Sequence, residues 1–290
     1  MYRLSGNVRG VLWMAASALA FSIMSISVKF VGANVSSFQI VFFRASVGFL
    51  VLLPFLFPPS KGQRLLKTQR PFMHLLRGLL GFFAMSTNFY AMTAMPLAPA
   101  LAISFSSPVF MTIPAAIFLK EKPDLGRFLC TVIGFLGMLL MLRPGGDLPF
   151  VPSIIALMGA VAVACVVIVI KKLSATEDPF TTLFYFSALT GTFAVILAPL
   201  GWQDLEPAQW LLLAGVGCFG SLGQYLMLRA YRVGELTAVS PASFLQLMLG
   251  GIAGFVIFNE VLDWATLAGC GLIAASALLI TWLETRRSGA

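Results

Sequence analysis

LAPALAISFSSPVFMTIPAAIFL, residues 97–119, is the stretch that decides the fold, together with the charged turn KEKPD at 120–124 and the apolar run from Leu125 to Leu142 that follows it. A hydrocarbon core about 30 Å thick takes about 20 apolar residues per helix. The pattern therefore predicts two membrane helices joined by a tight charged turn. The first run also contains polar and helix-breaking residues, in the segment Ser104–Pro108, that hydrocarbon does not favour.

The same pattern returns about 139 positions later in the chain. The apolar runs Leu236–Phe258 and Leu262–Trp282 flank Asn259-Glu260, and Glu260 falls where Glu121 stands in the first copy. At this offset eight identities align: Gly78 with Gly217, Gly81 with Gly220, Ala91 with Ala230, Leu97 with Leu236, Ser104 with Ser243, Phe105 with Phe244, Ile113 with Ile252 and Glu121 with Glu260. The matching order of turns and spans is the stronger argument for an internal repeat.

The composition extends this interpretation to the whole chain. Of the 290 residues, 59% are apolar and only 10% are charged, whereas a soluble domain of this length needs more charge to cover its surface. We expect helices rather than barrel strands because the apolar runs have no period of two. The predicted fold class is an all-α integral membrane protein with ten transmembrane helices. The predicted spans are 8–31, 36–57, 71–95, 97–119, 125–142, 150–171, 179–200, 208–231, 236–258 and 263–283.

The net charge of +8 is distributed unevenly over the predicted turns. If the N-terminus is cytoplasmic, the outer turns contain only Lys29 and Arg143 as basic residues, and Arg44 lies inside a span. All other Lys and Arg residues, Arg77 among them, then fall on the inner side. This positive-inside bias predicts that both termini are cytoplasmic and that the chain spans the cytoplasmic membrane, the inner membrane of a bacterium. It also explains the basic charge without a nucleic-acid partner.

The repeat divides the chain into two halves, residues 1–144 and 145–290, with five predicted spans each. An odd number of spans per half forces the halves into opposite orientations. At an offset of 142, Lys29 also aligns with Lys171 and Phe42 with Phe184. We therefore expect two inverted five-helix repeats, an arrangement typical of alternating-access transporters.

Polar side chains in the middle of the predicted spans are the candidate ligand contacts, because hydrocarbon offers them no partner. The expected substrate-binding set is Arg44, Ser86, Asn88, Tyr90, Ser104, Ser106, Ser107, Gln224, Tyr225, Ser243 and Gln246. Amides supply directional hydrogen bonds, hydroxyls rotate to donate to or accept from different ligand groups, and aromatic rings stack on a planar group of the ligand. Arg44 either pairs with a substrate carboxylate or has a snorkelling or structural role.

The residues quoted so far resemble the drug/metabolite transporter superfamily, specifically its EamA-type members with ten helices in two five-helix repeats. The resemblance covers nearly the whole chain. Two departures are visible, because Lys120 and Asn259 stand where a glycine usually precedes the glutamate of each turn. The matching motifs are Phe42-Phe43-Arg44, Leu76-Arg77-Gly78, Phe89-Tyr90-Ala91, Ser104-Phe105-Ser106-Ser107-Pro108, Leu119-Lys120-Glu121, Ile133-Gly134-Phe135-Leu136-Gly137, Arg143-Pro144-Gly145, Gly223-Gln224 and Asn259-Glu260.

The resemblance implies a proton- or gradient-coupled carrier, an exporter or an exchanger for a small metabolite. It implies a central cavity lined by the third, fourth, eighth and ninth spans, with the first and sixth contributing. Substrates in such members include S-adenosylmethionine, riboflavin and amino acids. The expected cavity contains no ionisable side chain apart from Arg44 and the two tyrosines, which favours facilitated movement, exchange or export over proton coupling.

A membrane-embedded enzyme and a channel are the alternative interpretations. An enzyme needs convergent acids, bases, nucleophiles or metal ligands, but the chain has one histidine and no carboxylate deep in any predicted span. The four cysteines form no C-x-x-C pair, so no metal or cofactor is predicted. A channel is disfavoured because the repeats are inverted. Spans 5 and 10 are the least polar at depth, and we expect them at the periphery, bracing each half or meeting a second subunit in a homodimer.

Overall fold

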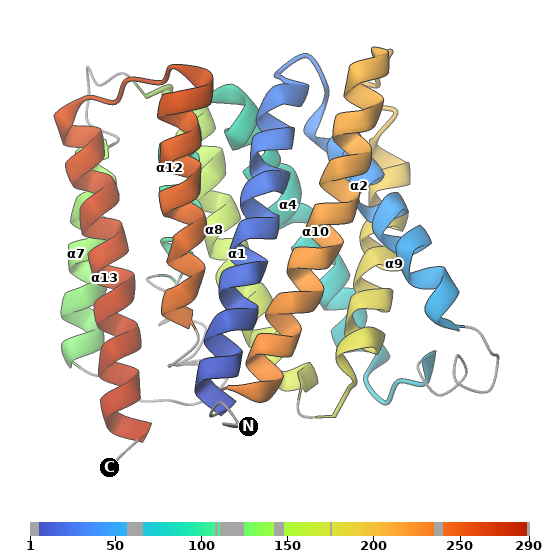
Figure 1. The fold of residues 1–290 in the computed structure, drawn as a ribbon, viewed down its shortest axis with the longest axis horizontal. Helices are drawn as coiled ribbons and strands as arrows, with labels where there is room; N and C mark the ends of the chain where they lie inside the picture. The colour runs from blue at the N-terminus through green and yellow to red at the C-terminus, as the bar shows by residue number, and fades with distance from the viewer. Residues whose placement is uncertain are drawn as a thin grey trace, which may run out of the picture.

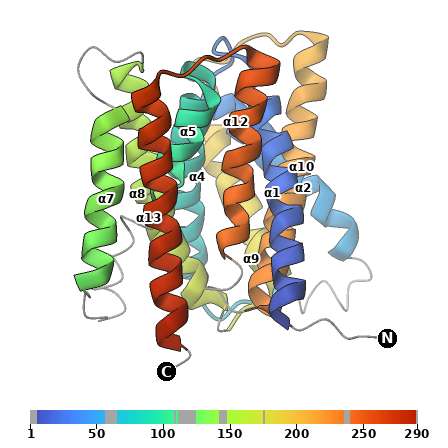
Figure 2. The same cartoon turned by 60° about the vertical axis from the view of Figure 1, so that its left-hand side comes forward.

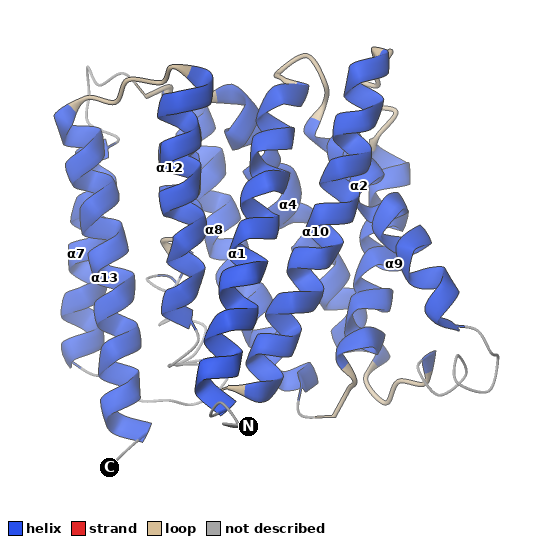
Figure 3. Cartoon of the chain, in the orientation of Figure 1, coloured by secondary structure: helices blue, strands red, loops and turns tan. Residues whose placement is uncertain are grey.

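The computed structural model describes residues 6–56, 66–107, 110, 125–141, 148–174, 176–234 and 240–288. These residues form ten α-helices, two short 3-10 helices and no strand (Figure 3), which confirms the all-helical prediction. Within the described residues, each predicted span contains one of these α-helices. The elements are α1 (Gly6–Val31), α2 (Ser37–Leu52), η1 (Leu53–Leu56), α4 (Pro71–Ala94), α5 (Leu97–Ser104), α7 (Leu125–Met141), α8 (Phe150–Ser174), α9 (Pro179–Leu197), α10 (Pro207–Val233), η2 (Ser240–Phe244), α12 (Leu245–Phe258) and α13 (Trp264–Ser288).

Four helical segments among the described residues are long and apolar enough to cross a membrane: Val8–Val31, Phe150–Ile170, Pro179–Leu197 and Pro207–Val233. Shorter apolar helices occupy Ser37–Leu52, Ala242–Phe258 and Trp264–Ser276. The structure therefore bears out a helical protein with several apolar spans. Ten crossings stay a prediction.

Capping chemistry explains where two of the long helices begin. α9 begins after Asp178, whose side chain accepts a hydrogen bond of 2.8 Å from the backbone N–H of Phe180. α10 begins after Glu206, which forms a reciprocal capping box with Gln209. Both helices have proline in the first turn, where the N–H that proline lacks has no helical partner in any case.

Helices that are far apart in the sequence pack against each other. α1 contacts α10, α4 contacts α8, and α2 contacts both α9 and α10. α5 contacts α8 and α12, and α7 lies beside α13 at one edge of the bundle (Figures 1 and 2). Every one of these contacts joins the first half of the chain to the second. α1 begins and α13 ends on the same side of the bundle (Figure 1).

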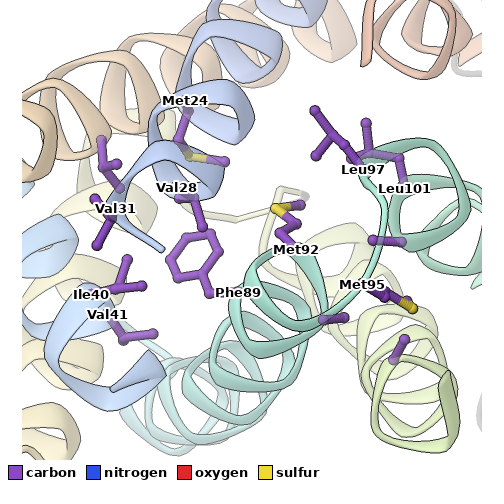
Figure 4. Packing of buried hydrophobic residues seen from close by; sticks show 14 of the residues in the cluster. Met24, Val28, Val31, Ile40, Val41, Phe89, Met92, Met95, Leu97 and Leu101 are labelled. Carbon is purple, nitrogen blue, oxygen red and sulfur yellow. The ribbon is translucent and has the colours of Figure 1, made fainter. Parts of the chain in front are cut away.

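The largest apolar cluster lies where α1, α2, α4 and α5 meet. In Figure 4 the side chains of Val28, Phe89 and Met92 point into the space between these helices, with Leu97 and Leu101 on the far side. All five side chains are buried. This cluster is continuous from α1 to α5 and holds α4 against its neighbours.

Two predicted spans are not continuous α-helices. α5 ends at Ser104, and both the N–H and the hydroxyl of Ser106 donate to the carbonyl of Ile103. A serine that bonds its own backbone competes with the helical ladder. The rest of this span, except Phe110, lies outside the described residues. The matching span of the second half begins with the 3-10 helix η2 before α12.

The contact between α10 and α2 yields a test of this packing. A Cβ atom at Gly217 would overlap with Cβ of Val47 and lie 2.6 Å from its Cγ1. We expect Gly217→Ala to lower the stability by about 1–3 kcal/mol, because a β-branched neighbour cannot move aside cheaply. The measurement is the midpoint of thermal unfolding in detergent.

Gly271→Ala in α13 is the matched control, since a Cβ atom there meets nothing within 4 Å. Alanine also favours helix over glycine, so the control midpoint should stay or rise. Equal midpoints for the two variants would contradict the close approach of α10 to α2.

Candidate functional site

Arg44 of α2 lies where four helices meet, and only 6% of the residue is exposed. Its Nη2 donates to Oε1 of Gln224 on α10 at 3.5 Å, and its Nη1 to Sδ of Met85 on α4 at 3.3 Å. Its guanidinium carbon lies 5.6 Å from the ring centroid of Phe186 on α9. Sequence reasoning proposed Arg44 and Gln224 separately, and the structure brings them together.

A glycine on α10 makes room for Arg44. A Cβ atom at Gly220 would lie 2.9 Å from Nε of Arg44 and 3.0 Å from Sδ of Met24 on α1. Small residues of this kind let helices approach closely around a long polar side chain.

A second buried arginine, Arg77 of α4, contacts the same aromatic ring. Its guanidinium carbon lies 4.1 Å from the centroid of Phe186, and only 2% of the residue is exposed. Gly81, one turn further along α4, admits the ring, because a Cβ atom there would overlap with Phe186 and lie 3.3 Å from Nη1 of Arg77. Sequence analysis counts Arg77 among the basic residues of the inner side of the membrane, and the structure adds that its side chain is buried against α9.

Neither arginine is paired with a carboxylate among the described residues. The Nε atoms of Arg44 and Arg77 are buried without a hydrogen-bond partner there, as are Oγ of Ser86 and Oδ1 of Asn88 on α4. The two guanidinium carbons cannot be more than 9.7 Å apart, the sum of their distances to the ring centroid. Burying cations without partners is costly, and like charges at this separation repel. The arginine cluster is defined as Arg44, Arg77, Met85, Phe186 and Gln224.

Three other predicted residues do not join this cluster. Asn88 donates from Nδ2 to the carbonyl of Ala84 at 2.7 Å, and the same nitrogen would lie 3.3 Å from a Cβ atom at Gly159, so it faces α8. Tyr90 and Tyr225 are more than one third exposed. The ring of Tyr225 is covered by the guanidinium of Arg229 at 5.7 Å from its centroid.

The remaining predicted residues lie on α5, on η2 and α12, and in the turn after α5. Ser106 is fully buried, whereas Ser104, Ser107, Ser243 and Gln246 are half-buried. Nε2 of Gln246 lies 3.4 Å from Oγ of Ser25 on α1. The two segments meet through a pair of tilted aromatic rings, because the centroids of Phe105 and Phe244 are 5.4 Å apart.

An ion pair joins several helices at one end of the bundle. Nζ of Lys29, at the end of α1, lies 3.0 Å from Oε1 of Glu260 and donates to the carbonyl of Met95 at 2.6 Å. The other carboxylate oxygen, Oε2 of Glu260, accepts from the N–H of Leu97 at the start of α5 at 2.7 Å. Charge-assisted hydrogen bonds of this length are strong. We call Lys29, Met95, Leu97 and Glu260 the lysine–glutamate lock.

The turn after α12 directs Glu260 into this lock. Asn259 adopts a left-handed conformation with φ of 52°, and the N–H of Glu260 donates to the carbonyl of Gly254 at 2.9 Å. Gly254 leaves room for the carboxylate, since a Cβ atom there would lie 2.6 Å from Oε2 of Glu260. Asparagine tolerates the left-handed region, so the glycine expected before this glutamate is not needed.

Polar contacts also tie together the opposite end of α4. Glu177, in the turn between α8 and α9, accepts from Oγ1 of Thr68 at 2.9 Å and from the N–H of Gln69 at 3.0 Å. Nε2 of His74 lies 3.9 Å from the same carboxylate, and the centroids of the His74 and Tyr185 rings, which are tilted relative to each other, are 4.6 Å apart. Within the described residues no group of three His, Cys, Asp or Glu side chains converges as a metal site.

Sequence reasoning missed Arg77, Phe186 and the lock. Arg77 lies about two turns after the start of α4. The direction of its side chain depends on which face of α4 packs against the neighbouring helices. The lock could have been found from the repeat, because Lys29 aligns with Lys171 and Glu260 aligns with Glu121. Two recurring, oppositely charged positions at span ends indicate a pair.

The chain is similar in sequence to a family of known proteins. The model of the EamA-like transporter family matches residues 8–143 and 151–282. An S-adenosylmethionine uptake transporter of Rickettsia felis is 34% identical, over 96% of this chain and 94% of the relative. A riboflavin transporter of Vibrio cholerae is 30% identical, over 97% and 95%. A pseudopaline exporter of Pseudomonas aeruginosa is 30% identical, over 94% and 95%.

A solved crystal structure has the same overall fold. It superimposes with a TM-score of 0.66 and covers 96% of this chain and 98% of its own, at 18% sequence identity. At this level of identity the likeness extends to the fold alone.

Replacing Gln224 tests the arginine cluster. Gln224→Ala removes the oxygen that accepts from Arg44 and leaves a buried cation with fewer partners, so we expect a loss of about 1–3 kcal/mol in stability. The measurement is thermal unfolding of the purified protein in detergent.

Gln246→Ala is the matched control for this variant. It loses only a 3.4 Å contact with a neutral hydroxyl, so its unfolding midpoint should fall much less. If both variants unfold at the same temperature, the Arg44–Gln224 contact contributes nothing to stability.

Proposed function

The chain belongs to the EamA-like transporter family, and on this premise we propose that it is a secondary transporter that moves a small metabolite by alternating access. The family and the named relatives are transporters. The chain is therefore a multi-pass membrane transporter of small molecules and not an enzyme. The proposal adds the mechanism, the orientation and the substrate.

The pairing of helices supports two inverted repeats, residues 1–144 and 145–290. In that scheme α1 corresponds to α8 and α4 to α10, so the contact of α1 with α10 has its counterpart in the contact of α8 with α4. Corresponding elements also meet each other, as α2 with α9, α5 with α12, and α7 with α13. The rings of Phe105 and Phe244, which align in the repeat, contact each other. The family model also matches once in each half.

The proposed topology has ten crossings of the cytoplasmic membrane, the inner membrane in bacteria, with both termini in the cytoplasm. An even number of crossings agrees with α1 beginning and α13 ending on one side of the bundle (Figure 1). The basic residues of the inner turns set the orientation. In this orientation the lysine–glutamate lock lies at the outer end. The edge formed by α7 and α13 is the proposed face for a homodimer.

The observation that most supports alternating access is that the lock joins the two halves. Lys29, Met95 and Leu97 belong to the first half, and Glu260 belongs to the second. The side chains of Lys29 and Glu260 are 16% and 11% exposed, so water screens the pair weakly. In the proposed cycle the lock closes the outer end and opens as the halves rock. Lys171 and Glu121 hold the matching sequence positions for a second lock at the inner end.

The proposed substrate is S-adenosylmethionine, with riboflavin or an amino acid as the alternatives. The relatives named for S-adenosylmethionine uptake have the higher identity, at 34%. The proposed binding residues are those expected from the sequence, on α2, α4, α5, α10, η2 and α12 and in the turn after α5. The relatives include both an uptake carrier and an exporter, so exchange in either direction is the proposed mode.

Counterflow in proteoliposomes tests the transport proposal. Vesicles with the purified full chain, preloaded with unlabelled S-adenosylmethionine, should take up labelled S-adenosylmethionine at least about 10-fold faster than protein-free vesicles. Riboflavin and amino acids are tested in the same way, each with and without a pH gradient. Exchange predicts a rate that the gradient leaves unchanged. Absence of counterflow for every one of these compounds would refute the proposal.

Cross-linking tests the lock. In a variant whose native cysteines are replaced, Lys29→Cys with Glu260→Cys is joined by a short cleavable thiol cross-linker. Because the tether holds the two halves together, counterflow should fall more than about 10-fold and return after cleavage. Arg232→Cys with Asp178→Cys is the control. That exposed pair, 3.3 Å apart, lies within the second half, so its tether should leave transport intact. Full transport by the cross-linked Lys29–Glu260 variant would exclude the lock from the cycle.

A further inference from the structure

The arginine cluster has an excess of positive charge that its described neighbours do not balance. Arg44 and Arg77 are both more than nine-tenths buried and lie against one ring, that of Phe186. Contacts with a ring face stabilise a guanidinium by about 0.5–2 kcal/mol, which offsets only part of the cost of burial. Glu177, in the turn between α8 and α9, has a carboxylate near the first turn of α4. That carboxylate already accepts hydrogen bonds from Thr68 and Gln69.

The free donors of the cluster point to a ligand that accepts hydrogen bonds. Nε of each arginine has no partner among the described residues. A guanidinium is a planar fork of donors that matches the two oxygens of a carboxylate. Phe186 orients both forks, and Gln224 holds Arg44 from the side. Oγ of Ser86, on the same helix as Arg77, is a further buried hydroxyl without a described partner.

We propose that Arg44 and Arg77 form a carboxylate subsite of the transporter, with Phe186 and Gln224 as its positioning residues. The inference rests on the proposed transport function and names the substrate class, a small metabolite with a free carboxylate. A carboxylate between the two guanidiniums neutralises one charge and screens the repulsion between them. Polyamines and other cations without an anionic group are excluded, because they add positive charge to a buried dication.

The subsite also orients the proposed substrate. S-adenosylmethionine has one carboxylate, an ammonium group on the same carbon, and a positively charged sulfonium further along the molecule. The carboxylate end binds the arginine cluster, and the sulfonium lies away from it. Removing the carboxylate therefore changes binding more than any change at the other end of the molecule.

Two matched pairs of compounds test the subsite. S-adenosylmethionine differs from its decarboxylated analogue only in the carboxylate, and methionine differs from methioninol only in replacing the carboxylate by an alcohol. Binding of each to the purified wild-type chain is measured as thermal stabilisation, and transport of the first pair as counterflow. We expect the carboxylate-bearing member of a pair to bind about 10- to 100-fold more tightly, as for a charge-assisted contact.

Three variants separate a ligand role from a structural role. Arg44→Gln and Arg77→Gln should each reduce this discrimination at least about 10-fold, and Arg77→Lys should restore part of it because lysine keeps the charge without the fork. Arg232→Gln, which removes one exposed positive charge, is the control and should discriminate like the wild type. Loss of stability in the Arg variants with unchanged discrimination would overturn the subsite.

The outcomes distinguish this inference from the transport proposal. If wild-type protein exchanges S-adenosylmethionine and its decarboxylated analogue equally well, the subsite is wrong and the transporter stands. If S-adenosylmethionine is not exchanged but methionine still stabilises the protein more than methioninol in an arginine-dependent way, the substrate is wrong and the subsite stands. Equal binding within both pairs by the wild type, including no binding at all, overturns the subsite without reliance on any variant.

Discussion

The hydrocarbon of the membrane offers no hydrogen-bonding partner, and this constraint decides where the polar groups of the chain lie. Short hydroxyl side chains such as Ser22, Ser25 and Thr87 donate to carbonyls of their own helix. Ser17 instead reaches across to the carbonyl of Gly223 on α10. Longer polar side chains need several helices at once, so they lie where helices converge. Polar groups left without partners among the described residues are therefore few, and they are concentrated on α2 and α4.

The two charged sites of the bundle differ in how complete they are. In the lysine–glutamate lock, an acid, a base, a carbonyl and an N–H satisfy one another across four chain segments. In the arginine cluster, two bases share one ring, and Arg44 alone also contacts an amide, with no acid among the described neighbours. A complete network stabilises one arrangement of the halves, whereas an incomplete one retains affinity for an added anion. In the proposed transport cycle the first property suits a gate and the second suits a substrate site.

Small residues make both sites possible, because they let side chains occupy space between helices. Gly220 admits Arg44, Gly81 admits Phe186, and Gly254 admits the carboxylate of Glu260. Gly81 and Gly220 align in the repeat, and each lies beside an arginine: Arg77 in the first case, Arg44 in the second. Glycines at two aligned sequence positions thus leave space between helices, and the two guanidiniums beside them lie near one ring.

The amino-acid sequence by itself determined the class of structure. The length of the apolar runs, the charges in the turns and the recurring pattern are all properties of the linear chain. It also indicated the transporter family and singled out Arg44 and Gln224, since a charge or an amide in the middle of an apolar run needs a partner. Only the tertiary structure decided which partner each group has. Arg77 turns inward and Asn88 faces α8 because the neighbouring helices, not the local sequence, determine which face of α4 is covered. The lock likewise exists only because the ends of α1, α4 and α12 meet the start of α5.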